Sequence, residues 1–352
     1  MSHREFVVSN DLLDRPGELR ARVEQDGYLF VRGLLPRDDV LRVRRAILDI
    51  CRAAGWLVAG ADLLDGRADT ARTTVEPEPA YMQVYNQVLR LEAFNALAHH
   101  PALVGVVSTL VGEPAFPHPL KIARLMFPQN VRHTTPPHQD FVFIQGTPET
   151  FTCWLPLGDC PRELGGLTVN AGTHRAGLAY DYHLKRGAGG MGIDQDTLPD
   201  NWHTTDYQAG DVLLFHSFLV HQALPNRSPD RLRLSVDYRY QGPSQPISAI
   251  SVQPHFGQVT WEEVYRDWQA TDLQYYWQHL KLTVIPLDPR YAQQREAEAF
   301  TLARQGDPLA RPILVRIAER DPDPARRAQA RQALAELERV RAARGPAAGE
   351  QA

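Results

Sequence analysis

The stretch AGDVLLFHSFLVHQALPNRSPDRLRLSVDYR, residues 209–239, carries the clearest strand signals in the chain. A Gly-Asp pair marks a tight turn into the apolar run VLLFH, and the segment RLRLS then alternates polar and apolar residues. Side chains two residues apart on a strand share a face, so Arg231, Arg233 and Ser235 project together. The intervening leucines need an apolar partner layer, which leaves the arginine face to a pocket or to solvent.

The same kind of signal extends over residues 115 to 242. Short runs rich in β-branched and aromatic residues are separated by clusters of Gly, Pro, Asn and Asp; they are KIARLMF, FVFIQG, FTCWLPLG and GLTVNAG, followed by the stretch quoted above. Several short strands at this spacing indicate a barrel or a sandwich. We therefore expect a mainly β domain.

Helical patterns flank this β region. A short strand, GYLFVRG at 27 to 33, comes before a helix that starts near Pro36 and places Val40, Val43 and Ile47 at helical spacing. Two more helices are expected near 88–98 and 101–112. Helical patterns return after Pro254 and include WEEVYRDWQ.

The C-terminal segment DPDPARRAQARQALAELERV resembles half of a HEAT-type repeat. A single unit of that kind cannot bury its own apolar face, because such units depend on stacked neighbours. We expect one or two helices docked on the core, with the final GPAAGEQA frayed.

Composition excludes several classes of function. The chain has 352 residues, 43% of them hydrophobic, and a formal net charge of -4, so no global field attracts nucleic acid or an anionic membrane. Three cysteines in this length argue against a disulfide framework. Charges interrupt the first apolar residues, and no later window reads as a bilayer span. We expect a cytoplasmic protein, with no nucleic acid and no membrane as partner.

Two ionisable residues interrupt an apolar run in TPPHQDFVFIQ, residues 135–145. If 138 to 144 is a strand, His138 and Asp140 lie on one face. A His and an Asp so placed supply two of the three ligands of the facial triad that holds a non-haem Fe(II). An isolated pair of this kind is more often an exposed pair or a structural ion pair, so a third ligand must follow.

The third ligand is found in the stretch quoted first. His216 and His221 are five residues apart, and in an unbroken strand they face opposite sides, so parity leaves open which one reaches the metal. Downstream, the arginine face suits a dicarboxylate, because a guanidinium binds a carboxylate through two parallel hydrogen bonds.

These motifs together resemble the phytanoyl-CoA dioxygenase family of Fe(II)/2-oxoglutarate-dependent oxygenases. The resemblance rests on the order of His-x-Asp, then WLPLGDCPRELGGLTVNAGTHRAG, then GDVLLFHSFLVHQALPNRSPDRLRLS. The N-terminal QDGYLFVRGLLPRDDVLRVRRAI is similar to that family's opening, so the resemblance covers about the first 240 residues. It implies a double-stranded β-helix (a jelly-roll, cupin-like barrel) with flanking helices and a helical C-terminal extension.

The resemblance also implies roles for single residues. His138, Asp140 and His221 match the metal ligands, and His216 matches a histidine that does not bind iron. Arg231 matches the arginine that binds the far carboxylate of 2-oxoglutarate, with Arg233 as the alternative. Trp154 matches an aromatic wall beside that co-substrate. A further polar contact is placed at Gln83, or at Gln87.

The chain departs from the family pattern in three places. ELGGL stands where the family often has ENGGL, and NAGTH stands in place of Pro-Gly-Ser-His. Ala223 replaces a serine that is common two residues after the distal histidine. The last change removes one expected contact to the co-substrate.

The resemblance implies hydroxylation, or another oxidation, of an unactivated C–H bond in a small-molecule metabolite, with 2-oxoglutarate and O2 going to succinate and CO2. The oxygenase domain is expected over 1–285, with its barrel at about 115–242, and a helical extension over 286–352. The protein is expected to be a monomer or a homodimer. Two alternatives stay open: a cupin-type metalloenzyme that does not use 2-oxoglutarate, and a non-catalytic relative that binds a small molecule.

Overall fold

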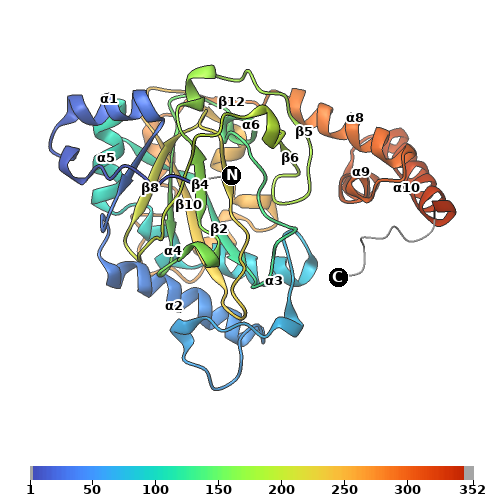
Figure 1. The fold of residues 1–352 in the computed structure, drawn as a ribbon, viewed down its shortest axis with the longest axis horizontal. Helices are drawn as coiled ribbons and strands as arrows, with labels where there is room; N and C mark the ends of the chain where they lie inside the picture. The colour runs from blue at the N-terminus through green and yellow to red at the C-terminus, as the bar shows by residue number, and fades with distance from the viewer. Residues whose placement is uncertain (1–2, 345–352) are drawn as a thin grey trace.

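The computed structural model describes residues 3–344, and its two larger sheets are antiparallel and are surrounded by helices (Figure 1). The principal strands are β1 (Tyr28–Val31), β2 (Phe116–Met126), β3 (Phe151–Pro156), β4 (Leu167–Asn170), β7 (Trp202–His203), β8 (Val212–His216), β9 (His221–Ala223) and β10 (Arg233–Gln241). The larger sheet has the order β1-β8-β3-β10-β2, and a smaller sheet has the order β7-β4-β9. Two short pairs complete the set: β5 (His183–Leu184) with β6 (Met191–Gly192), and β11 (Ile247–Ser248) with β12 (Val284–Ile285).

The alternation expected in RLRLS continues through the whole of β10. Ser235 lies opposite Pro156 of β3 and Arg124 of β2, so the polar residues of β10 and their cross-strand partners share one face of the larger sheet. The other face carries Leu234 and Val236, both buried. The polar face of the larger sheet therefore points to the interior, and its apolar face points outward. Helices must cover this outward face to remove its apolar side chains from water.

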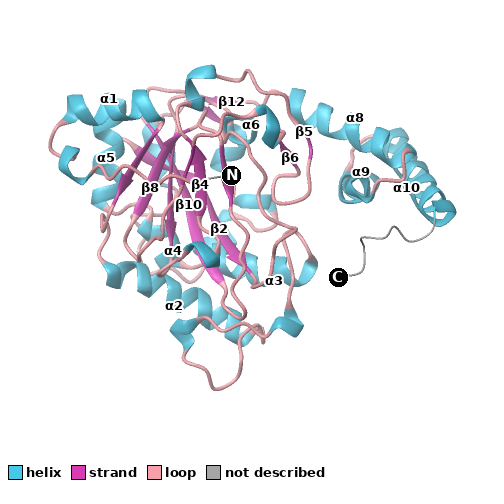
Figure 2. Cartoon of the chain, in the orientation of Figure 1, coloured by secondary structure: helices cyan, strands magenta, loops and turns pink. Residues whose placement is uncertain are grey.

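Helices supply that outer layer (Figure 2). They are α1 (Pro16–Asp26), α2 (Arg37–Ala53), α3 (Pro79–Leu89), α4 (Glu92–Leu97), α5 (Pro101–Val111) and α7 (Trp261–Tyr265). Tyr238 and Tyr240 of β10 reach this layer, where their hydroxyls donate to the backbone carbonyls of Phe94 at 2.6 Å and Ala98 at 2.8 Å. Both rings are fully buried, which is worth about 1.5–3 kcal/mol for a large side chain.

Most of the expected elements are confirmed. The strand at 27–33 is β1, the helix after Pro36 is α2, and the helices near 88–98 and 101–112 are α4 and α5. Cys51, Cys153 and Cys160 are free and buried, in agreement with the absence of a disulfide framework.

One expected strand is wrong. FVFIQG does not form a strand, because Phe141–Ile144 is the short helix α6, which begins directly after Asp140. A continuous apolar run of four residues carries no period, so sequence alone does not separate a buried strand from a buried helical turn.

The segment Glu92–Val111 corrects the expectation that no window is apolar enough to span a bilayer. Its length of 20 residues and mean hydropathy of 1.3 meet that criterion by composition. The segment folds as two helices, α4 and α5, that are interrupted before Pro101, and Phe94, Leu97, Leu103 and Val107 are buried in the main core.

The segment DPDPARRAQARQALAELERV forms one helix, α10 (Pro324–Arg344), as expected, and two further helices precede it, α8 (Arg290–Arg304) and α9 (Arg311–Arg320). They project from one side of the β region (Figure 1). The helices bury a cluster of their own, formed by residues such as Ala303, Leu314 and Leu337. The final GPAAGEQA, expected to be frayed, lies outside the described residues.

Candidate metal centre

His138 and His221 come together through the backbone. They form an isolated antiparallel bridge in which each amide donates to the other's carbonyl at 3.0 Å. Their imidazole rings lie 4.1 Å apart between centroids. His221 belongs to β9, so the bridge attaches the segment after Pro136 and Pro137 to the edge of the smaller sheet.

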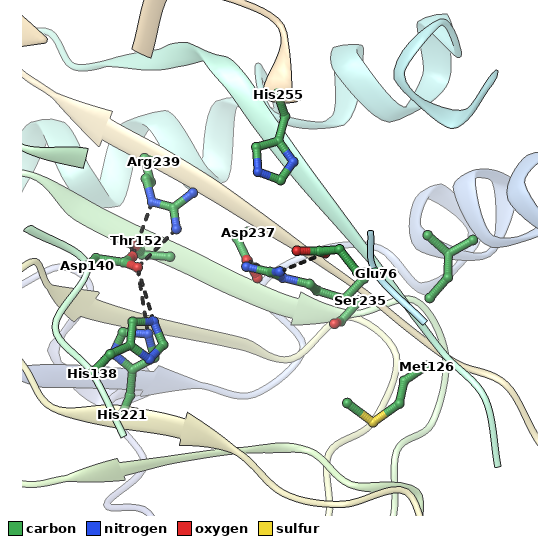
Figure 3. Close-up of polar contacts among 12 residues, drawn as sticks. Glu76, Met126, His138, Asp140, Thr152, His221, Ser235, Asp237, Arg239 and His255 are labelled. Carbon is green, nitrogen blue, oxygen red and sulfur yellow. Dashed lines mark hydrogen bonds and ion pairs between the residues drawn. The ribbon is translucent and has the colours of Figure 1, made fainter. Parts of the chain in front are cut away.

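Asp140 also lies beside the two histidines, but not through the strand that the sequence predicted. Its backbone is already helical, with φ −58° and ψ −34°, because it stands just before α6. The two-residue strand period therefore does not bring it beside His138; the turn into α6 does. Its Oδ1 atom lies 3.6 Å from Nε2 of His138 and 3.8 Å from Nε2 of His221 (Figure 3).

The tautomers of both histidines follow from their second nitrogens. Nδ1 of His138 lies 2.8 Å from the carbonyl oxygen of Pro136, and Nδ1 of His221 lies 2.9 Å from that of Leu219. A carbonyl only accepts, so each Nδ1 must carry the proton. Each Nε2 then presents a free lone pair toward Oδ1 of Asp140, the arrangement that metal-binding histidines adopt.

Burial and neighbouring charge set the ionisation of this group. Burial would raise the pKa of Asp140, but the guanidinium of Arg239, followed by the two histidines, holds it well below its usual range. Burial, together with His138, lowers the pKa of His221 to about 3. A carboxylate beside neutral imidazole is the protonation state in which these side chains bind a divalent metal.

The three donors fit a metal such as Fe(II). Bonds of about 2.0–2.2 Å to imidazole nitrogen and carboxylate oxygen place neighbouring donors about 3 to 3.5 Å apart. The observed separations of 3.6 and 3.8 Å are only slightly wider. Among residues 3–344, these three form the group of His, Cys, Asp and Glu side chains placed to hold a metal ion.

The three donors line a cavity of about 690 Å³ that includes an open mouth. Both sheets contribute to its walls: the smaller provides Leu167, His221 and Ala223, and the larger provides Arg124, Thr152, Trp154, Phe215, Arg233, Asp237 and Arg239.

Arg233, not Arg231, reaches this cavity. Arg233 is 2% exposed, and its Nη1 donates to Ser235 Oγ at 2.5 Å, while its Nε bonds to no group in the described part of the chain. Arg231 is exposed at an isolated bridge with Arg67, ahead of the start of β10, so the assignment to Arg231 is corrected. A buried guanidinium without an acidic partner among residues 3–344 fits the far carboxylate of 2-oxoglutarate.

Of the other site residues expected from the sequence, one lines the cavity and the alternatives Gln83 and Gln87 do not. Trp154 is buried on the cavity wall, where its ring packs on Tyr207 with centroids 4.8 Å apart. Gln83 and Gln87 do not reach the cavity: both lie on the exposed face of α3, and Gln87 donates to the backbone of Gln83. Helical phase places Tyr81 inward instead.

His216 lies away from the cavity walls. It stands at the end of β8, where its ring packs edge-on against Phe151 with centroids 5.5 Å apart. Its Nδ1 accepts from the amide of Phe218 at 3.1 Å. The strand breaks between His216 and His221, so β8 and β9 belong to different sheets and present the two histidines to different surroundings.

Sequence reasoning missed several cavity residues. Arg124 binds Asp237 at 3.1 Å and Glu76 at 3.2 Å, and Arg239 binds Asp140 at 3.0 Å (Figure 3). Asp237 and Arg239 continue the alternation that begins at Arg233, so following the pattern to the end of the strand would have found them. The distant Glu76 carried no such signal.

Two imidazoles and one carboxylate around an open cavity define a non-haem metal enzyme of the facial-triad class. The model of the family "Phytanoyl-CoA dioxygenase (PhyH)" matches residues 23–234. The chain belongs to this family, and it is an Fe(II)- and 2-oxoglutarate-dependent dioxygenase.

Several relatives are hydroxylases. The 1-deoxypentalenic acid 11-beta-hydroxylase of Streptomyces arenae is 30% identical over 256 residues, covering 67% of this chain and 85% of the relative. The L-proline trans-4-hydroxylase of Streptomyces griseoviridis is 24% identical over 255 residues, covering 64% and 84%. Among solved structures, the epimerase SnoN in complex with Fe3+, alpha ketoglutarate and nogalamycin RO gives a TM-score of 0.48 at 24% identity, covering 66% and 86%.

Proposed function

We propose that this dioxygenase hydroxylates an unactivated C–H bond of a small molecule, with Fe(II) held by His138, Asp140 and His221. The observation that carries the proposal is the convergence of these three buried donors on one open cavity. When bound, Fe(II) and 2-oxoglutarate supply the activation of dioxygen, and 2-oxoglutarate goes to succinate and CO2.

The chain's own residues bind and orient the reactants. Arg233 pairs with the far carboxylate of 2-oxoglutarate, and Ser235, which already accepts from Arg233, fixes the direction of the guanidinium. Trp154 and Phe215 exclude water from the cavity wall beside the co-substrate. The carbonyls of Pro136 and Leu219 keep the metal-facing nitrogens of both histidines unprotonated.

The charges in the cavity indicate an uncharged substrate end. Its walls carry three arginines and three acids, namely Arg124, Arg233, Arg239, Glu76, Asp140 and Asp237. Fe(II) and 2-oxoglutarate add two positive and two negative charges, so the filled site is balanced. A further buried charge on the substrate would have no partner, which is costly.

A matched pair of probes tests this part of the proposal. The Streptomyces arenae relative is named for 1-deoxypentalenic acid. We expect the methyl ester of that acid, or an uncharged analogue, to stimulate succinate formation more than the free acid does. Greater stimulation by the free acid would contradict an uncharged substrate end.

The general test of the function is succinate formation. Purified protein with Fe(II), ascorbate and 2-oxoglutarate should form succinate slowly without any prime substrate. Absence of both succinate formation and 2-oxoglutarate binding would contradict the proposed function.

We also propose that the two sheets form a double-stranded β-helix, supported by the cavity that lies between them. The oxygenase domain would cover 1–285 and the helical extension 286–352, in line with the separate apolar cluster of α8 to α10. The protein would be cytoplasmic and act as a monomer or homodimer. Light scattering of the purified chain tests the oligomeric state.

A further inference from the structure

Arg239 binds the carboxylate of Asp140 through two nitrogens. Its Nε donates to Oδ2 at 3.1 Å, and its Nη2 donates to Oδ1 at 3.0 Å. Both residues are buried, at 3% exposure each. Arg239 stands on β10 and Asp140 ahead of α6, so the pair joins the larger sheet to the segment that carries two candidate ligands (Figure 3).

The two oxygens of Asp140 are held unequally. Oδ2 accepts from the hydroxyl of Thr152 at 2.5 Å as well as from Arg239. Among residues 3–344, Oδ1 accepts a hydrogen bond from Arg239 alone, and it is the oxygen that faces the two histidine nitrogens. Thr152 lies opposite Arg239 in the pairing of β3 with β10, so both donors come from neighbouring strands of one rigid sheet.

This arrangement allows the carboxylate only one oxygen for a metal. Turning Oδ2 toward the histidines would break its bonds to Thr152 and to Arg239 Nε, and would leave buried donors without an acceptor. A facial triad needs its remaining positions open, and a carboxylate that bound through both oxygens would occupy one of them.

We propose that Arg239, assisted by Thr152, is a positioning residue that restricts Asp140 to one-oxygen metal binding and so keeps a position open for 2-oxoglutarate. The inference rests on the proposed metal site. The third nitrogen of Arg239, Nη1, points away from Asp140 and meets no hydrogen-bond partner among residues 3–344. The bonds of Arg239 to side chains in this part of the chain thus all go to the carboxylate of Asp140.

A purely structural role makes a different prediction. If Arg239 only neutralises a buried charge, its variants lose stability, because a broken buried pair leaves the other charge uncompensated. The folded variants would then bind metal and 2-oxoglutarate as the wild type does. Metal affinity and 2-oxoglutarate affinity therefore separate the two roles.

The experiment uses two variants that keep the charges. Arg239→Lys retains the positive charge but not the paired donors, and Thr152→Val removes the hydroxyl while leaving the ion pair intact. Arg124→Lys is the matched control: Arg124 is a partly buried arginine of the same cavity that binds Asp237 and Glu76, and it bonds to none of the proposed ligands.

The full-length chain, freed of metal, is titrated with Co(II) and then with 2-oxoglutarate by calorimetry. We expect Arg239→Lys and Thr152→Val to lose about 10- to 100-fold in Co(II) affinity, as is usual when a group that orients a ligand is removed. The 2-oxoglutarate affinity of the Co(II)-loaded variants should also fall. Arg124→Lys should match the wild type in Co(II) affinity.

Wild-type Co(II) and 2-oxoglutarate affinities in a folded Thr152→Val protein would overturn the positioning role even if Arg239→Lys fails to fold. A wild-type protein that binds no Co(II) would overturn the metal site and, with it, this inference. Loss of Co(II) affinity in the two variants, with wild-type affinity in Arg124→Lys, would support the role.

Discussion

Arg231 and Arg233 show how two arginines on one strand face can differ completely. They have the same side chain and the same parity, yet Arg233 is buried at the cavity and Arg231 is exposed. The difference arises because β10 begins at Arg233, so that only the second arginine lies within the sheet. Local sequence does not state where a strand enters the sheet, and the resemblance matched the exposed member of the pair.

Replacing Arg233 by lysine should weaken 2-oxoglutarate binding. A charge-assisted hydrogen bond contributes about 1.5–3 kcal/mol, so its loss corresponds to about 10- to 150-fold in the dissociation constant. Anaerobic titration of the Fe(II)-loaded protein with 2-oxoglutarate measures the effect. Arg231→Lys serves as the control and should bind as the wild type does; a large loss in Arg231→Lys would restore Arg231 as the anchor.

The two histidines make a similar pair. His221→Ala should abolish tight metal binding, because it removes one of three buried donors. His216→Ala should keep metal affinity within a few-fold of the wild type, since His216 contacts Phe151 and the backbone of Phe218 and not Asp140. The metal content of each variant, measured after dialysis against Fe(II) or Co(II), shows which histidine binds the metal. Loss of metal from the His216 variant alone would reverse the assignment of the distal ligand.

Strand β2 has a buried lysine on the face that packs against the helices. Lys121 lies opposite Tyr238 and is 4% exposed beneath the helical layer. Among residues 3–344, its ammonium donates to the carbonyl of Pro119 at 3.5 Å and to the hydroxyl of Tyr276 at 3.4 Å, and it lies 5.3 Å from the centroid of the Tyr276 ring, with no carboxylate beside it. Burial lowers the pKa of Lys121 to about 7.

This lysine should make stability depend on pH. Between pH 7 and about 10 the unfolded chain binds a proton at Lys121 that the folded chain does not, so the free energy of unfolding should rise with pH across that window. Lys121→Met should stabilise the protein at pH 7, on the order of 1–4 kcal/mol, and the gain should shrink toward pH 10. Urea unfolding at pH 7 and 9.5 measures both effects.

Lys281→Met is the matched control for Lys121→Met, because Lys281 is exposed. Its substitution should leave the pH dependence of unfolding unchanged. Equal gains from Lys121→Met at pH 7 and 9.5 would show that Lys121 stays protonated in the folded protein.

At the scale of the whole molecule, hydrogen bonds connect the C-terminal helices to one wall of the cavity. Glu298 of α8 accepts from the amide of Leu184 in β5 at 2.6 Å, and Gln294 donates to the carbonyl of Tyr182 at 2.5 Å. The loop between β5 and β6 carries Ala188, which lines the cavity. The helices beyond the family match at 23–234 thus brace one wall of the site.

Glu298→Ala should loosen that wall. Without the acceptor for the amide of Leu184, residues 183–192 should exchange backbone hydrogen faster, while β10 keeps its protection. Hydrogen exchange followed by mass spectrometry measures each segment. Glu296→Gln is the control, since Glu296 pairs with Arg316 and Arg326 within the extension. Unchanged exchange over 183–192 in Glu298→Ala would contradict the bracing role.

The sequence by itself indicated the β class, most strands and the pair His138 and Asp140, with His216 or His221 as the third ligand; the family resemblance selected His221. Strand alternation, turn residues and residue chemistry are local properties, so they can be recognised in the sequence. The helix at Phe141–Ile144, the choice of Arg233, and the contacts of Arg239 and Glu76 were decided only by the tertiary structure. They depend on which segments meet across the two sheets, and such long-range packing leaves no period in the sequence.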